Sequence, residues 1–117
     1  MTSFVRSVER KLYLQQKKMF IKELGKKELP VGLDPFERSI QLRKGTLHNK
    51  IYNIHHILPR RDGGEDKIYN FALMKIDLHK VLEKLLEQIR EMQPIFIEKY
   101  RPALKRLAKD HGGLTIG

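Results

Sequence analysis

The hydrophobic positions of the chain follow a helical spacing at the N-terminal end. Residues 3–24 are predicted to form one long helix that ends at Gly25. The apolar positions expected to be buried are Phe4, Val8, Leu12, Met19, Phe20 and Leu24. The opposite face carries Arg6, Arg10, Lys11, Lys17, Lys18 and Lys22. A solvated helix surface explains these cations at least as well as a DNA-binding surface does.

A second helix is predicted from its capping residues. Asp34 can be its N-cap, Pro35 suits the first helical position, and Glu37 follows the cap by three residues. The expected helix covers about residues 35–44 and is closed by Gly45.

The central part of the chain changes from a strand pattern to a helix pattern. Residues 51–58 and 71–76 favour two strands, and the turn signal Asp62-Gly63-Gly64-Glu65 lies between them. A helix over residues 78–92 is expected to follow, with Asp77 as its cap. Its predicted buried positions are Leu78, Val81, Leu82, Leu85, Ile89 and Met92.

A last helical region is expected over residues 95–110, with Pro102 as a kink or a new start. The predicted fold class is therefore α+β, with a short β-hairpin and a helix embedded in a mostly helical chain. We expect one domain over residues 1–117. Its parts are a helical part at 1–45, a ββα core at about 51–92 and a C-terminal helical part at 94–111.

Composition narrows the choice of partners. The 24 Lys and Arg against 14 Asp and Glu give a formal net charge of +10, which favours nucleic acid or an acidic membrane surface over a neutral partner. A merely soluble basic surface is the plainer interpretation. The chain has no cysteine, so disulfides and cysteine-ligated zinc are excluded. No apolar run is long enough to span a bilayer and no signal peptide is evident, so we expect a cytoplasmic protein without a membrane partner.

Three histidines in the central part of the chain suggest a metal-binding or catalytic site. Adjacent strand residues point to opposite sides, so His55 and His56 are expected to have different tasks. His79 lies in the first turn of the predicted helix, which would bring it towards His55 if the helix crosses the hairpin. The expected result is a two-histidine metal site with positions left for water and phosphate.

Polar residues around the turn complete the candidate site. Asn70 can both donate and accept hydrogen bonds, so it could bridge the two sides of the loop and hold a histidine in place. From Arg38 to Arg61 there are six Lys or Arg and no acid, which makes the approach to the histidines positive. The candidate nucleic-acid-binding residues are Arg60, Arg61, Lys67, Lys50, Arg43 and Lys44.

The segment over about residues 51–92 resembles the HNH, or ββα-metal, nuclease family. The resemblance rests on His55-His56-Ile57-x-Pro59, Gly63-Gly64, Asn70-x-x-Leu73 and His79, and it is similar to the HNH segments of group II intron maturases and colicin-type DNases. It implies that His55 and His79 bind the metal, that His56 is the general base and that Asn70 orients it. Colicin-type DNases have a further metal histidine where this chain has Glu83, which is a candidate third ligand or a surface carboxylate.

The resemblance implies a metal-dependent endonuclease that hydrolyses DNA phosphodiesters with little sequence specificity. One divalent ion is expected, Mg²⁺, Mn²⁺, Ni²⁺ or Zn²⁺, and the family's cysteine-ligated structural zinc is absent. The expected context is a bacterial toxin delivered to a target cell, or a phage, mobile-element or defence nuclease. A toxin would need an acidic immunity protein as inhibitor. A non-catalytic nucleic-acid-binding module and a basic helical interaction protein are the alternatives.

Overall fold

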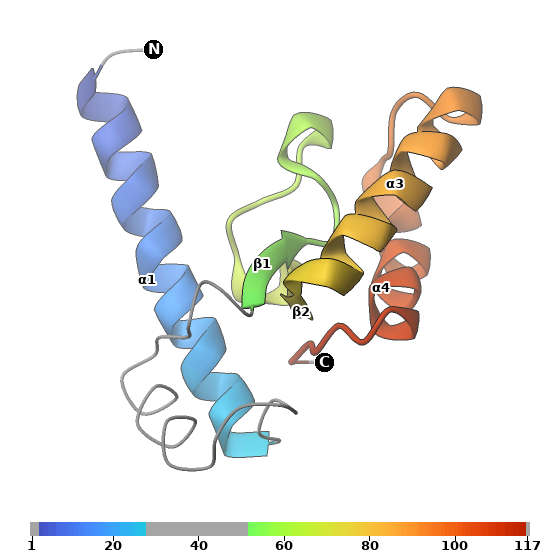
Figure 1. Cartoon of the computed structure of the whole chain (residues 1–117). Coiled ribbons are helices and arrows are strands. Elements are labelled where there is room, and N and C mark those ends of the chain that lie inside the picture. The colour runs from blue at the N-terminus through green and yellow to red at the C-terminus, as the bar shows by residue number, and fades with distance from the viewer. Residues whose placement is uncertain (1–2, 28–51, 117) are drawn as a thin grey trace.

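The structure of the protein is a computed structural model that describes residues 3–27 and 52–116. Its architecture is mixed α+β, as the sequence predicts, with a two-stranded hairpin among helices (Figure 1). The described α-helices are α1 (Ser3–Lys27), α3 (Ile76–Met92) and α4 (Arg101–Asp110), and the strands are β1 (Tyr52–His56) and β2 (Phe71–Lys75). The predicted helix over residues 35–44 lies outside the described residues, and so do the candidate cations Arg43, Lys44 and Lys50.

Strands β1 and β2 form an antiparallel hairpin whose register places His55 opposite Ala72 and His56 opposite Phe71. The predicted first strand extended to Leu58, but β1 ends at His56. The reason lies in the loop. Beyond His56, the main chain of Leu58 is hydrogen-bonded by the side chain of Asn70 and not by a partner strand. Helix α3 begins at the residue after β2, so the ββα order of the prediction is present.

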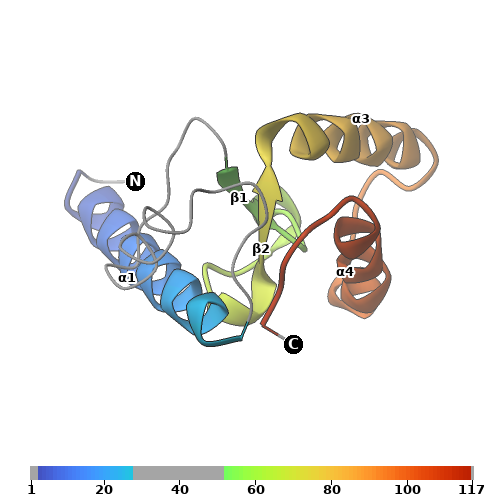
Figure 2. The same ribbon diagram turned by 60° about the horizontal axis from the view of Figure 1, so that its bottom comes forward.

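Strand β2 is buried on both faces. Phe71 and Leu73 pack with residues of α1, and the alternate residues Ala72 and Met74 pack with residues of α3 and α4. Figure 2 shows this arrangement, with α1 on one side of the hairpin and α3 and α4 on the other. Leu114 pairs with Leu73 through two main-chain hydrogen bonds of 2.8 and 2.9 Å, at the middle of the second edge of β2.

The C-terminal part of α1 supplies its packing against the sheet. Phe20, Ile21 and Leu24 are buried, but Phe4 and Leu12 are 77% and 54% exposed, so the prediction of a buried stripe along the whole helix was wrong. Length explains the difference. A 25-residue helix is about 37 Å long, whereas a five-residue strand spans about 17 Å. The helix also continues to Lys27 instead of ending at the predicted Gly25.

The helices after the hairpin differ from the prediction in their starts and in their buried residues. Lys75 occupies the N-cap of α3, and Asp77 lies in the first turn, where its charge still suits the helix dipole. Leu82 and Leu86 are the buried residues of α3, while the predicted core positions Leu78, Val81 and Met92 are exposed.

Helix α4 begins at Arg101, six residues later than predicted, because the chain first makes a 3₁₀ turn at Glu98–Tyr100. Pro102 lies in the first turn of α4, so it marks a new start and not a kink. No helix within the described ranges is long and apolar enough to cross a membrane.

A partly buried ion pair joins the loop of the hairpin to the C-terminal end of α3. Arg90 donates two hydrogen bonds to the carboxylate of Asp62, at 3.0 and 2.6 Å. The two side chains are only 15% and 3% exposed. Arg90 also donates to the carbonyl oxygen of Pro94 at 2.9 Å, and its guanidinium carbon lies 4.5 Å from the ring centre of Phe96. The hydrogen bonds from Arg90 hold the pKa of Asp62 below its usual value.

Replacing this carboxylate is expected to destabilise the fold in a pH-dependent way. We expect Asp62→Asn to lower the free energy of unfolding at pH 7 by about 1–3 kcal/mol, because the Arg90 guanidinium loses its charged acceptor. Since folding lowers the pKa of Asp62, its contribution is complete above the unfolded-state pKa of about 3.9 and disappears as the pH falls through the folded-state value. Urea unfolding at several pH values measures the difference between the two proteins.

Glu91→Gln is the matched control, because Glu91 is an exposed acid next to Arg90 near the end of α3. It is expected to change the free energy of unfolding by less than about 0.5 kcal/mol. A difference between Asp62→Asn and the parent chain that stays constant down to the lowest pH would contradict the assigned role of the Asp62 charge.

Candidate functional site

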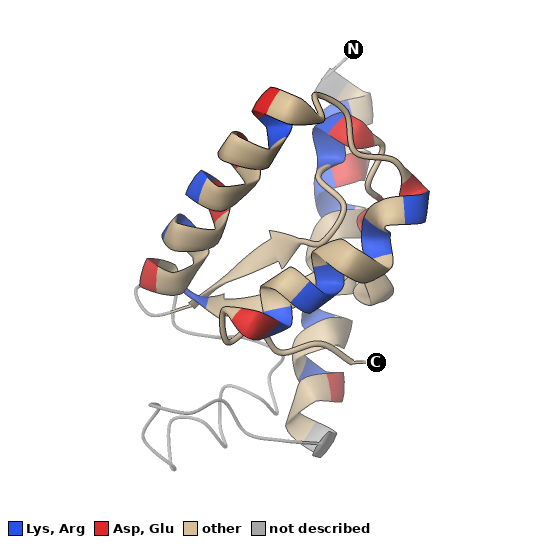
Figure 3. Ribbon diagram, turned by 90° about the vertical axis from the view of Figure 1, so that its right-hand side faces the viewer, with Lys and Arg blue, Asp and Glu red and all other residues tan. Residues whose placement is uncertain are grey.

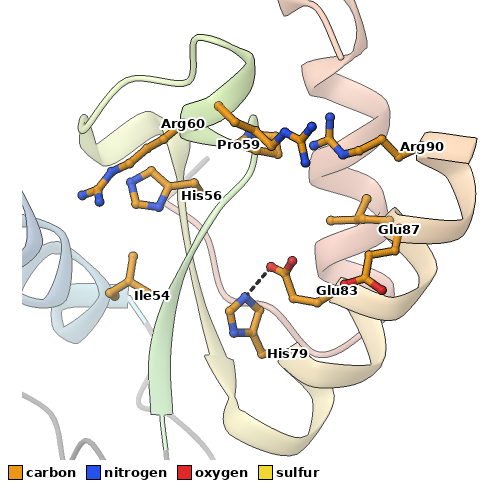
Figure 4. Close-up of a pocket in the computed structure, with 10 residues that line it drawn as sticks. Ile54, His56, Pro59, Arg60, His79, Glu83, Glu87 and Arg90 are labelled. Carbon is orange, nitrogen blue, oxygen red and sulfur yellow. Dashed lines mark ion pairs between the residues drawn. The ribbon is translucent and has the colours of Figure 1, made fainter. Parts of the chain in front are cut away.

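Three of the predicted site residues meet where β1 crosses α3. His55 comes from β1, and His79 and Glu83 come from successive turns of α3. The Nδ1 atom of His55 lies 3.1 Å from the Nε2 atom of His79. The Oε1 atom of Glu83 lies 2.9 Å from His79 Nε2 and 3.4 Å from His55 Nδ1. The close-up in Figure 4 shows the carboxylate of Glu83 directed at the ring of His79.

The spacing of these three atoms fits the ligands of one metal ion. Ligand atoms about 2.1 Å from an ion lie about 3.0 Å apart at right angles and about 3.4 Å apart at tetrahedral angles. His55 is 3% exposed and Glu83 is 51% exposed, so the group is closed on the strand side and open towards solvent. Hydrogen bonds from His55 and His79 hold the pKa of Glu83 well below its usual range, which keeps the carboxylate ionised. His55, His79 and Glu83 could therefore hold a metal ion.

His56 faces the other side of the hairpin, as the alternation of strand residues predicts. Its ring stacks on Tyr13 of α1, with 6.0 Å between the ring centres and 24° between the ring planes, and it meets the ring of Phe71 edge-on at 5.3 Å. Its Nε2 atom lies 2.7 Å from Oδ1 of Asp66. The two histidines are thus divided between the two faces, with His55 towards α3 and His56 towards α1.

Asp66 fixes the protonation pattern of His56. Burial by itself would raise the pKa of the Asp66 carboxyl, but hydrogen bonds from His56 and Arg60 outweigh burial and lower that pKa. An ionised Asp66 only accepts, so Nε2 of His56 must carry the hydrogen that it donates. Burial lowers the pKa of His56, and the hydrogen bond with Asp66 offsets part of that effect. In the neutral ring, Nδ1 is then the nitrogen that accepts a proton.

Arg60 joins this cluster from the same loop. Its Nε atom donates to Asp66 Oδ1 at 2.9 Å, and its guanidinium carbon lies 4.7 Å from the ring centre of Tyr13. Tyr13, His56, Asp66 and Arg60 therefore form a closed ring of contacts between α1 and the loop. The stacking partner of His56 lies 43 positions earlier in the chain, so no local sequence pattern indicated it.

Asn70 shapes the loop through the main chain. Its Oδ1 atom accepts from the Leu58 amide at 2.9 Å, and its Nδ2 atom donates to the carbonyl oxygens of Leu58 and Glu65 at 3.0 and 3.1 Å. It is buried, and these three bonds bridge the two sides of the loop as the sequence suggested. Its side-chain bonds go to the main chain and not to His56, so any influence of Asn70 on that ring passes through the loop conformation.

The two turn glycines are required for different reasons. Gly63 has a φ of +91°, a left-handed conformation that other residues adopt at a cost. A Cβ atom on Gly64 would lie 1.7 Å from the carbonyl oxygen of Leu58, so no larger residue fits without moving the main chain. The close approach of Gly64 to Leu58 brings the two sides of the loop together where Asn70 bridges them.

The candidate cations line two hollows, and Arg60 lines both of them. Arg60 and Arg61 line a pocket of about 330 Å³ that is also lined by His56, His79 and Glu83. In Figure 4 His56 and Arg60 lie at one end of this pocket and His79 and Glu83 at the other. Lys67 instead lines a larger hollow between the loop and α1.

Replacing Asn70 by an acid is expected to loosen the loop. In Asn70→Asp the side chain loses both hydrogen bonds that it donates, and a carboxylate is placed against two carbonyl oxygens. We expect the free energy of unfolding to fall by about 2–4 kcal/mol, because buried polar groups are left without partners. Urea unfolding measures the loss. Gln88→Glu, the same amide-to-acid change at an exposed position of α3, serves as control. Equal stability of the two variants would contradict the role of Asn70 in the loop.

Comparison with known proteins identifies no relative of this chain. The chain matches no protein-family model, and no curated protein and no solved structure is similar enough to it to count as a match.

Proposed function

We propose that this chain is a metal-dependent endonuclease of the HNH type that hydrolyses DNA phosphodiester bonds. The observation that carries the proposal is the meeting of His55, His79 and Glu83 at one point. His79 and Glu83 line a pocket that is also lined by His56, Arg60 and Arg61. A phosphodiester substrate needs a cationic group for its oxygens, a base for the attacking water and room for both. The histidine, glycine and asparagine pattern of the HNH family supports the same reaction.

The group of His55, His79 and Glu83, called the metal group below, is proposed to take one divalent ion. Two imidazole nitrogens and one carboxylate oxygen suit Mn²⁺, Ni²⁺ or Zn²⁺ better than Mg²⁺, which prefers oxygen ligands. When bound, such an ion would polarise the phosphate and stabilise the leaving oxygen. His55 and His79 would hold it through Nδ1 and Nε2, and the ionised Glu83 would supply the negative ligand.

The remaining residues are proposed to activate water and bind phosphate. His56 takes the proton of the attacking water at Nδ1, because Nε2 is engaged by Asp66. Asp66 is a positioning residue, since it holds the imidazole ring and its tautomer. The exposed side chains of Arg60 and Arg61 bind phosphate oxygens from the loop side of the pocket.

The net charge of +10 supports an anionic polymer as substrate, and the described residues include no separate recognition module. We therefore propose cleavage with little sequence specificity. A toxin context would add an acidic inhibitor protein that covers the basic surface.

Removing the proposed base tests the reaction directly. We expect the parent chain to nick plasmid DNA with Mn²⁺, Ni²⁺ or Zn²⁺ and to stop when EDTA is added. His56→Ala is expected to cut about 10²–10⁴-fold more slowly, because the attacking water loses its base. His111→Gln is the control, since His111 lies at the end of α4, outside the lining of the pocket, and its Nδ1 contacts the Leu107 carbonyl oxygen. If His56→Ala cut DNA as fast as the parent chain, the assigned base would be wrong. DNA binding without any cleavage would support a non-catalytic binding module instead.

Metal affinity can be measured apart from cleavage. Calorimetric titration with Zn²⁺ or Mn²⁺ is expected to give one site per chain. His55→Ala and His79→Ala are expected to abolish it, and Glu83→Gln to weaken it by at least the 10-fold to 100-fold typical of lost supporting groups around a metal. His56→Ala should bind the ion like the parent chain. If Glu83→Gln bound the ion as tightly as the parent chain, Glu83 would not be a ligand but a surface carboxylate.

A further inference from the structure

A second hollow lies between α1 and the hairpin loop, on the far side of His56 from the metal group. Its volume is about 800 Å³. Helix α1 contributes Arg6, Arg10 and Tyr13, which share one face because they are spaced by four and three residues. The loop contributes Arg60 and Lys67. We call this hollow the α1 groove.

The α1 groove adjoins the pocket that the proposed catalytic residues line. Arg60 lines both hollows, and His56 of the pocket stacks on Tyr13 of the groove. The contacts among Tyr13, His56 and Arg60 therefore form the boundary between the two hollows, and a ligand that extends across this boundary would reach the groove. This shared boundary distinguishes the groove from a hollow elsewhere on the surface.

The charge of the groove favours an anionic occupant. Four cations line it, against the acids Glu9, Glu65 and Asp66. Asp66 is already engaged by His56 and Arg60. Helix α1 as a whole carries eight Lys or Arg and two Glu, and Figure 3 shows basic residues along its length. Arg6 and Arg10 have no ion-pair partner among residues 3–27 and 52–116.

The groove offers contacts to a sugar–phosphate backbone and few to bases. The Tyr13 ring is already in contact with both His56 and Arg60, and the Gln16 side chain accepts from the Ile68 amide at 3.2 Å. The side chains left for a ligand are guanidinium and ammonium groups, which bind phosphates without reading sequence.

We propose that the α1 groove binds the phosphates of the DNA strand that flanks the scissile bond, with Arg6 and Arg10 as the principal contacts. The proposal rests on the proposed nuclease function and adds the path of the substrate. It assigns Arg6 and Arg10 of α1 to substrate binding and predicts that their contribution is independent of the DNA sequence.

The test measures binding in the absence of cleavage. Fluorescently labelled 30-base-pair DNA is titrated with the protein in EDTA, which prevents cleavage, over a range of KCl concentrations, with and without Arg6→Ala/Arg10→Ala. We expect the double change to weaken binding about tenfold and to reduce the slope of log K against log salt by about 2, one for each lost phosphate contact. The loss should be the same for DNA of different sequence.

Lys11→Ala/Lys18→Ala is the matched control. It removes two charges from the same helix, but these exposed lysines do not line the groove. Its effect on affinity should be less than about threefold and its effect on the salt slope less than about 1. Circular dichroism and thermal unfolding establish that both double variants fold. A short oligonucleotide that fills only the pocket should bind the Arg6/Arg10 variant as it binds the parent chain.

Equal losses in the two double variants would overturn the proposal, because the effect would then belong to the overall charge. An equal loss for short and long DNA would overturn it as well, since the change would have disturbed the pocket itself. In both cases the parent chain still binds and cuts DNA, and the proposed nuclease function stands. If the parent chain neither binds nor cuts DNA in the presence of Mn²⁺, Ni²⁺ or Zn²⁺, both the nuclease function and the role of the α1 groove are wrong.

Discussion

The structure depends on the burial of β2 from both faces. Phe71, Ala72, Leu73 and Met74 are all nearly or fully inaccessible to solvent, and they alternate between the α1 cluster and the α3–α4 cluster. A hairpin of two five-residue strands is marginal by itself in water, so this packing provides its stability. It also fixes the register, because a slip of one residue would exchange the two faces. The register in turn assigns His55 to α3 and His56 to α1.

The two halves of the candidate site are supported in different ways. The metal group is set by regular elements, since a strand and two turns of an adjoining helix position His55, His79 and Glu83. His56 depends on irregular structure, since Asp66 and Arg60 belong to a loop that is held by Asn70 and by the close approach of Gly64 to Leu58. The backbone of a helix or strand already fixes where its side chains lie. A loop needs several buried polar contacts to position its side chains equally well.

The sequence predicted the elements that rest on local rules. Alternation along β1 separated His55 from His56, and the four-residue spacing on α3 brought Glu83 beside His79. Burial along α1 could not be predicted, because it depends on the length of a hairpin formed from residues far away in the chain. The contacts of Tyr13 and Asp66 with His56 could not be predicted for the same reason, since they exist only after α1 and the loop have packed.

The pairing of Leu114 with Leu73 has a consequence for the order in which the protein is made. Hairpin, α3 and α4 are all synthesised before Leu114, so a growing chain carries β2 with one uncovered edge until that residue is available. Uncovered strand edges pair readily with other chains. During synthesis β2 therefore has an edge that can pair with other chains, and the last described segment covers this edge at Leu73.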